Sequence, residues 1–207
     1  MGEEGMTRTF YRLDERLCLD FVNTVGYHTG DHPNEWLTDY TRLANWSYEA
    51  GALNEERQRD QLLQLAGQAP EEADRVLGQA VELREALFRV LCSVVRKERA
   101  PAEDMERINL YLSRSGKQFK LIADDANRFS MPFRPERVEM DSMLGPVVRS
   151  AADLLLSPDL ARLKLCGADA CGWLFLDTSR NHSRRWCSMD DCGNKEKAKR
   201  FYRKKTK

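Results

Sequence analysis

The chain has 207 residues, and its 33 basic and 33 acidic side chains give a formal net charge of zero. Hydrophobic residues make up 42% of the sequence, which is enough for one sizeable domain and a small appended unit. No apolar run approaches transmembrane length, and the acidic residues 1–5 do not resemble an export signal. These features exclude a membrane-spanning protein, and we expect a soluble cytoplasmic protein without a membrane partner.

The zero net charge hides an asymmetry along the chain. Residues 180–207 carry eleven basic and three acidic side chains, so this end has a charge of +8. Residues 1–179 carry the remaining 22 basic and 30 acidic side chains, a charge of −8. A neutral protein with its positive charge gathered at one end has the electrostatic footprint of a polyanion-binding module.

The first predicted element is a buried strand over residues 16–25, where apolar and other side chains alternate and the run ends in β-branched residues. Cys18 is interpreted as a small core residue. Asp20 and Asn23 need hydrogen-bond partners in so apolar a segment. Two interpretations stay open for them: a contact with a ligand or another domain, or a polar anchor for the following turn.

Residues 26–35 are rich in turn-forming side chains and are expected to form a loop. His28 and His32 flank Asp31, a grouping that could hold a metal or carry out acid–base chemistry, although no third partner is identifiable. Solvated loop histidines are the simpler interpretation. His28 is retained as a candidate contact with a ligand or another domain.

Helical signals follow one another between residues 38 and 116. Thr38 and Asn54 are the expected caps of the first two helices. Apolar residues at three- and four-residue steps, together with Gly and Pro punctuation, predict helices over residues 38–50, 54–69, 71–97 and 101–116. The third has a continuous apolar stripe and is expected to line the core.

Residues 117–140 change character, with short strands predicted at 118–122 and 137–140 that could join the first strand in one small antiparallel sheet. A further helix is expected over 143–156, and the break at 157–159 marks a domain boundary. The fold class is therefore α+β, with a mostly helical domain over 1–158 and a second unit over 159–207. No phosphate-binding glycine loop, nucleophile elbow or paired-histidine motif is present, so we do not expect an enzyme.

Four of the six cysteines lie in this second unit as two pairs, each with four intervening residues. Paired thiolates at short spacing supply the four ligands of a tetrahedral zinc ion, and four sulfur ligands leave no open position for catalysis. We expect a knuckle, a hairpin and a helix that carries two ligands near its start, which is a treble-clef-like arrangement with one structural Zn²⁺. His182 is an alternative ligand to one cysteine. The predicted ligands are Cys166, Cys171, Cys187 and Cys192.

Residues 173–181, 184–189 and 192–195 resemble the CGNR zinc finger, over about residues 160–205. Lys195 stands where that family has its namesake arginine. Residues 17–25 are similar to the opening motif of the ABATE domain, which precedes this finger in the same family. The resemblance implies a stress-responsive transcription regulator, with an ABATE-like domain over 1–158 that senses a small molecule or a protein partner and a DNA-binding finger over 159–207.

Basic residues of the finger are expected to contact DNA, mainly at phosphates. Arginine and asparagine can also read base edges bidentately, whereas Lys195 keeps the charge but lacks the planar fork. Neutralising the negative zinc–thiolate site is the competing role for Arg184 and Arg185. The predicted contact residues are Arg180, Asn181, Arg184, Arg185, Asn194, Lys195, Lys199, Arg200 and Arg203.

The terminal helix is predicted to have two faces. Lys195, Lys199 and Tyr202 share one face toward DNA, while Ala198 and Phe201 lie on another that could pack against the finger. An apolar cluster around the zinc is expected from Trp173, Leu174, Phe175, Trp186 and Phe201.

Other functions stay open at this point. Aromatic residues among basic ones also suit single-stranded nucleic acid, so a zinc-stabilised RNA-binding or protein-interaction module is the alternative. An enzyme using the histidine loop and a redox switch at the zinc thiolates are further hypotheses. A homodimer is possible because one small finger reads few base pairs.

Overall fold

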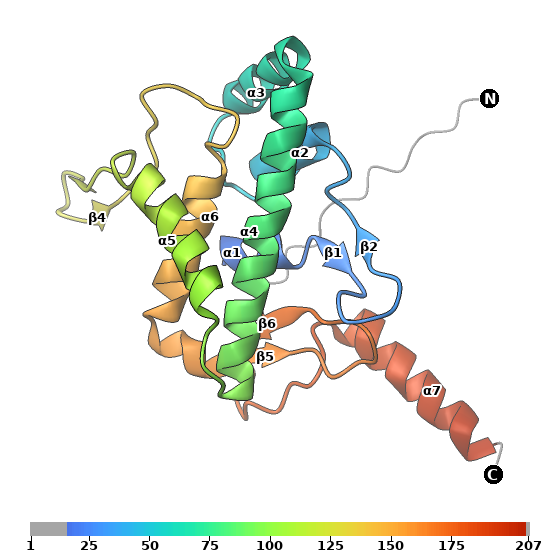
Figure 1. Cartoon of the computed structure of the whole chain (residues 1–207). Coiled ribbons are helices and arrows are strands. Elements are labelled where there is room, and N and C mark those ends of the chain that lie inside the picture. Colours follow the sequence, from blue (N-terminus) through green and yellow to red (C-terminus); the bar gives the residue numbers. More distant parts are fainter. Residues whose placement is uncertain (1–15, 206–207) are drawn as a thin grey trace.

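The computed structural model describes residues 16–205 of the chain. The α+β fold is confirmed, and helices dominate it (Figure 1). The helices are α1 (Leu17–Val22), α2 (Tyr40–Glu49), α3 (Glu56–Gln68), α4 (Pro70–Arg96), α5 (Ala102–Gly116), α6 (Leu144–Leu155) and α7 (Asn194–Lys205). The strands are β1 (Val25–Gly26), β2 (Asn34–Glu35), β3 (Ile122–Ala123), β4 (Phe129–Ser130), β5 (Leu163–Leu165) and β6 (Leu174–Leu176).

Helix α4 is the central element of the core. Pro70 occupies its first turn, where a missing backbone N–H costs nothing, and Lys97 ends it in a left-handed conformation with φ of 59°. Its predicted apolar stripe is buried and packs against α1, α2, α3 and α5, while α6 packs against α1 and α5 (Figure 1). No helix in residues 16–205 has the length and apolar composition needed to cross a bilayer.

The predicted helix positions are close to the observed ones, but two capping residues differ. Asp39, not Thr38, caps α2 by accepting a hydrogen bond from the backbone N–H of Arg42 over 2.8 Å. Helix α3 begins with a capping box between Glu55 and Gln58 instead of a cap at Asn54.

The predicted strand at residues 16–25 is wrong: most of it forms helix α1. Residues 18–22 are buried on all sides, between α4, α6 and β6. An alternating pattern reports a strand only when one face is solvated, and a short buried helix satisfies its backbone groups without a partner strand. Only Val25 and Gly26 are extended, in β1.

The prediction that the strands join in one small sheet is also wrong, because the structure has three separate antiparallel pairs of strands. In these pairs Val25 faces Glu35, Ile122 faces Ser130, and Leu165 faces Leu174. The predicted strand at 118–122 contributes little more than a bridge between Phe119 and Phe133, and residues 137–140 form a loop.

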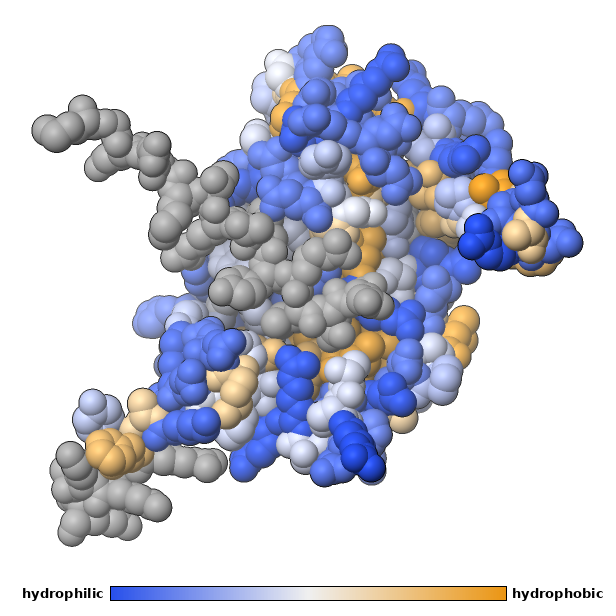
Figure 2. All heavy atoms as spheres, turned by 180° about the vertical axis from the view of Figure 1, so that it is seen from behind, coloured by the Kyte–Doolittle hydropathy of each residue, from blue (hydrophilic) through white to orange (hydrophobic). Residues whose placement is uncertain are grey.

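Hairpin β3–β4 protrudes from the body of the molecule (Figure 1). Its apolar side chains are solvent-exposed, and they stand out on the protruding segment at the right of Figure 2, which shows the opposite face. These exposed residues are Leu121, Ile122, Phe129 and Met131.

The side chains of hairpin β5–β6 pack into two separate clusters of buried residues. Leu163, Leu174 and Leu176 are buried in the main core with α1 and α4, although they come from the second sequence unit. Phe175 points the other way, into a second small cluster with the four paired cysteines. The second unit is therefore packed into the first, and is not joined to it by a linker alone.

Candidate metal centre and nucleic-acid interface

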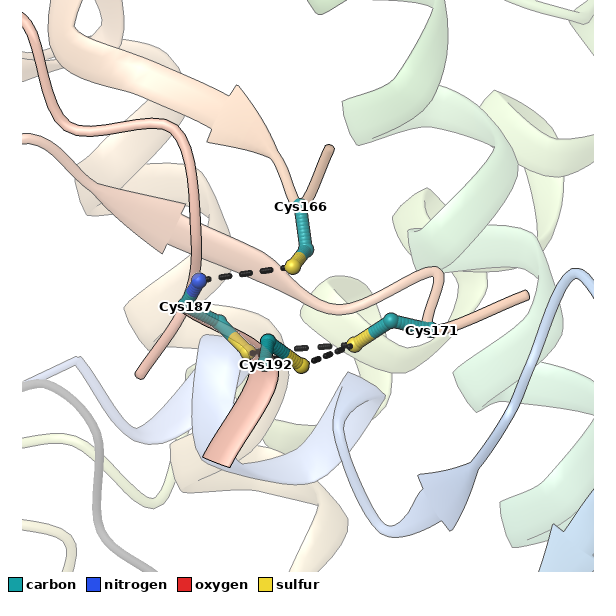
Figure 3. Close-up of side chains that lie close together, drawn as sticks. All are labelled: Cys166, Cys171, Cys187 and Cys192. Carbon is teal, nitrogen blue, oxygen red and sulfur yellow. Dashed lines mark hydrogen bonds between the residues drawn. The ribbon is translucent and has the colours of Figure 1, made fainter. Parts of the chain in front are cut away.

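The first cysteine pair lies in the turn between β5 and β6. The backbone N–H of Cys166 donates to the Trp173 carbonyl over 2.8 Å, and the N–H of Cys171 donates to the Ala168 carbonyl over 3.3 Å. Ala170 and Gly172 have φ of 62° and 71°, a left-handed conformation that glycine adopts without strain. This tight turn points both sulfur atoms toward the second pair (Figure 3).

The second pair lies just before α7. Cys187 follows an irregular loop, and a single π-helical turn at Met189–Gly193 carries Cys192. Ser188 caps this turn by accepting a hydrogen bond from the N–H of Asp191 over 3.3 Å. The order of knuckle, strand and helix agrees with a treble-clef-like finger, but both ligands precede α7 and do not lie within it.

The four sulfur atoms fit a tetrahedral metal ion. They lie within 4.8 Å of one another, and the Sγ–Sγ distances among Cys171, Cys187 and Cys192 are 3.6 to 3.7 Å (Figure 3). A tetrahedron of thiolates about 2.3 Å from Zn²⁺ has edges of about 3.8 Å, whereas a disulfide bond is about 2.05 Å long. All four cysteines are buried and unbonded, so the donor set fits one structural zinc ion and leaves no open position.

His182 lies outside this group of ligands. Its Nδ1 is 3.3 Å from the Asp177 carbonyl oxygen, and the residue is exposed. Among the described residues, the four cysteines form the cluster that could hold a metal ion, so the His28, Asp31 and His32 grouping does not form one.

Arg184 stabilises the finger internally. Its Nε donates to the Trp186 carbonyl over 2.9 Å, its Nη2 donates to the Cys187 carbonyl, and its guanidinium lies 4.6 Å from the centre of the Phe175 ring. Arg185 is exposed instead, with its guanidinium 5.5 Å from the Trp186 ring. Arg184 therefore has a structural role, whereas the neighbouring Arg185 lies at the surface.

A buried carboxylate shapes the loop that holds Arg180 and Asn181. Asp177 is fully buried and accepts hydrogen bonds from Lys164 Nζ over 2.5 Å and from the backbone N–H groups of Ser179 and Arg184 over 3.0 Å. Burial alone would raise the pKa of Asp177, but these bonds outweigh it and hold the pKa well below its ordinary value. The carboxylate therefore stays charged and fixes the loop.

This carboxylate was missed in the sequence, although a signal exists there. Asp177 directly follows the apolar run Leu174–Leu176, and two hydroxyl residues follow it, which is typical of a side chain that turns the chain by accepting backbone hydrogen bonds. Arg180 and Asn181 themselves are exposed.

Helix α7 carries the other predicted DNA contacts and projects away from the body of the molecule (Figure 1). Lys195 pairs with Asp191 over 2.6 Å, and Lys199 lies 3.0 Å from Glu196 and 3.3 Å from Asp169. Asn194 donates to the Asp190 carbonyl over 3.2 Å. Arg200 and Arg203 lie in the same helix.

The prediction that one face of α7 packs against the finger is wrong. Ala198 is exposed, and Phe201 is 56% exposed, so Phe201 does not join the apolar cluster around the cysteines. Leu174 does not join it either, because it points into the main core. The cluster consists of Trp173, Phe175 and Trp186, with Ala168 beside them.

Comparison with known families places both parts of the chain. Residues 15–158 match ABATE, a family described as "Putative stress-induced transcription regulator". The chain belongs to the ABATE family. Residues 162–205 match the CGNR zinc finger, which confirms both resemblances and agrees with the four-sulfur site. No curated protein matches the sequence.

The ABATE domain holds the CGNR finger through Asn23, which makes a contact between the two parts. Its side-chain amide pairs with the backbone of Leu174 in β6. Beside it, Trp173 Nε1 donates to the Val25 carbonyl over 2.7 Å, and the Trp173 ring meets Trp36 edge-on at 5.4 Å. Asp20 is buried in α1.

His28 makes a second contact between the ABATE domain and the finger. Its backbone N–H donates to the Cys171 carbonyl over 3.0 Å, while its ring lies 3.8 Å from the Phe88 ring and its Nε2 lies 2.8 Å from Glu85 Oε2. Burial raises the pKa of Glu85, but hydrogen bonds from His28 and Arg84 outweigh burial and hold it below the usual value. Glu85 is therefore a charged acceptor.

An ion-pair network that the sequence did not reveal supports this contact. Arg84 is buried and donates two hydrogen bonds to the Glu35 carboxylate, of 2.7 and 2.6 Å, and two to Glu85, of 3.0 and 2.9 Å. The network ties β2 to α4 beneath the loop that carries His28. A charged residue beside the apolar stripe of a long helix gives no sequence signal that it is buried.

Proposed function

We propose that the protein is a DNA-binding transcription regulator whose CGNR finger contacts DNA and whose ABATE domain senses an effector. The observation that supports this most is the charge of α7, a projecting helix with one acidic residue and seven basic ones. The basic residues are Lys195, Lys197, Lys199, Arg200, Arg203, Lys204 and Lys205.

The ion pairs of α7 are compatible with phosphate binding. Lys195 pairs with Asp191 and Lys199 with Asp169 at the surface, and the two lysine side chains remain 56% and 47% exposed. Exposed pairs contribute only about 0 to 1 kcal/mol, so a phosphate can replace the carboxylate at little cost. Lys197 is exposed without an ion pair among the described residues.

Other exposed residues extend the proposed surface onto the finger. Arg180 and Asn181 sit on the loop fixed by Asp177, and Arg185 lies over Trp186. A rigid loop loses little conformational entropy on binding, which suits direct reading of base edges. Arg184 is excluded from this set because its guanidinium is bound to the finger backbone.

A polar cavity in the ABATE domain supports the sensing part of the proposal. Its volume is about 410 Å³, and it lies between the end of α5 and the start of α6. Both signs of charge line it, from Arg114, Lys117, Glu139 and Asp141, together with the buried Tyr111. These groups suit a small polar effector with several hydrogen-bonding groups.

The histidine loop gives little support to an enzyme. The His28 side chain is 8% exposed and is held between Phe88 and Glu85, so it cannot reach a substrate without leaving that site. We therefore propose a binding protein without catalytic activity. The main competitor is binding of single-stranded RNA, which Phe201 and Tyr202, both exposed, would favour by stacking.

Fluorescence anisotropy of labelled duplex DNA across a salt series tests the proposal. The zinc-loaded wild type is compared with a variant in which Lys195, Lys197 and Lys199 are all changed to alanine. If each lysine meets one phosphate, the slope of log K against log salt falls by about 2.7 in the variant. A matched control removes three exposed basic residues far from α7, namely Lys120, Arg134 and Arg137.

Substitutions are used in preference to removal of residues 161–207, because such a truncation would expose the core surface that Leu174 and Leu176 cover. Equal slopes for both triple variants would mean that α7 is not the binding surface. Tighter binding to single-stranded RNA than to duplex DNA would favour the competing function.

A further inference from the structure

The loop between β1 and β2 packs closely against the zinc knuckle, which is the turn between β5 and β6 that holds Cys166 and Cys171. A Cβ atom on Gly30 would lie 2.7 Å from the Cβ of Ala170, and one on Gly172 would lie 2.9 Å from the Cβ of His28. Real Cβ atoms do not approach so closely, so the two loops touch with no space for an added methyl group. Ala170 and Gly172 flank the zinc ligand Cys171.

One backbone hydrogen bond links the two loops at the ligand itself. The His28 N–H donates to the carbonyl oxygen of Cys171. The same residue is fixed from behind by α4, through Phe88 and the charged Glu85. A continuous set of contacts therefore runs from α4 through His28 to Cys171.

We propose that His28 is a positioning residue for the zinc site, so that the ABATE domain sets how firmly the CGNR finger retains zinc. Helix α4 fixes the imidazole ring of His28, and the backbone N–H of the same residue positions Cys171. Groups outside the first coordination sphere that orient metal ligands commonly change metal affinity by about 10- to 100-fold. Here those groups come from a different domain than the ligands.

Linkage gives this arrangement a consequence in both directions. If the packing of α4 on the loop favours the zinc-bound knuckle, zinc must favour that packing by the same factor. An effector that shifts α4 would then lower zinc affinity, and loss of zinc would loosen the loop. The knuckle and α4 are thus energetically coupled without sharing a ligand.

Zinc retention can be measured directly, by competition between the full-length protein and a chromophoric zinc chelator. His28→Ala removes the ring that α4 holds, and we expect zinc affinity to fall by about tenfold or more. His32→Ala is the matched control, because His32 is in the same loop but is exposed. The two variants should differ clearly, and equal affinity for both would overturn the proposal.

A second pair of variants tests the contact without touching His28. Gly30→Ala drives a methyl group into Ala170, and we expect faster zinc release. Ala170→Gly removes the opposing methyl group and suits the φ of 62° at that position. The double variant should recover wild-type zinc retention. Persistent loss in the double variant would show that the effect does not arise at this contact, and would overturn the proposal. No nucleic acid is needed, so the outcome is independent of DNA binding.

Discussion

The side-chain amide of Asn23 completes the backbone hydrogen bonding of Leu174, 151 positions later in the chain. Asn23 Nδ2 donates to the Leu174 carbonyl over 2.8 Å, and Asn23 Oδ1 accepts from the Leu174 N–H over 3.0 Å. The amide acts as a neighbouring strand would, on the far edge of a two-stranded hairpin. This one side chain therefore does for β6 what a third strand would do.

Asn23→Ala should destabilise the whole protein. Both Leu174 backbone groups would be buried without partners, which costs about 2 to 4 kcal/mol of unfolding free energy. Urea unfolding in excess zinc measures this loss. Asn181→Ala serves as the control, because Asn181 is exposed, and it should change the unfolding free energy by less than about 0.5 kcal/mol. A similar small change for Asn23→Ala would mean that the contact contributes nothing net.

Substitutions of the neighbouring residues Arg184 and Arg185 should affect different properties of the finger. Arg184→Ala removes the bonds to two backbone carbonyls beside Cys187, so zinc release under chelator should become faster. Arg184→Lys should not restore it, since lysine lacks the planar fork. Arg185→Ala should leave zinc retention unchanged and weaken DNA binding. Equal zinc release rates for Arg184→Ala and Arg185→Ala would contradict the division of roles.

Asp191→Asn should strengthen DNA binding. The Asp191 carboxylate lies 2.6 Å from Lys195 Nζ and repels phosphate, so its removal should raise affinity about two- to fivefold at low salt. Asp125→Asn makes the same change in net charge on the exposed β3–β4 hairpin, on the other side of the molecule from α7 (Figure 1). If both variants bind DNA equally well, net charge alone explains the gain.

The buried thiol of Cys18 should make the free energy of unfolding fall as the pH becomes alkaline. Burial raises the pKa of its thiol to about 11, whereas an unfolded cysteine has a pKa of about 8.5. The folded state favours the neutral thiol, so this contribution is intact below about pH 8.5 and is lost as the pH rises toward 11.

Cys18→Ala should therefore flatten the fall in unfolding free energy between about pH 8.5 and 10.5, by up to about 1.4 kcal/mol per pH unit. Val22→Ala, also fully buried in α1, should lower the unfolding free energy equally at every pH. Urea unfolding with reductant across this range distinguishes the two. Parallel curves for Cys18→Ala and Val22→Ala would sink the expectation.

Much of this fold was predictable because its long helices obey local rules. The stripe of α4, Pro70 at its start and the Gly116 end of α5 need no knowledge of the tertiary structure. The zinc site was equally predictable, since four cysteines at matched spacing constrain one another through a metal. Helix α1 was not, because a six-residue segment buried on every side has no solvated face to give a period.

The partners in these contacts could not be predicted, for a different reason. Asn23 and His28 are candidates in the sequence for a contact with a ligand or another domain, but their side-chain partners lie 151 and 57 positions away. Arg84 gives no such signal, and its partner Glu35 lies 49 positions away. Only the folded chain brings them together. Arg184 and Arg185 show the same limit at short range, since identical neighbours take opposite roles according to where each side chain points.

The position of Leu163, Leu174 and Leu176 in the main core also bears on protein synthesis. A nascent chain that has released only residues 1–158 from the ribosome contains every core helix but lacks the hairpin that closes their apolar surface. The apolar surface of the ABATE domain is therefore closed only after residues 163–176 have emerged. The turn of the same hairpin holds Cys166 and Cys171, so the segment that completes the main core also brings the first pair of zinc ligands.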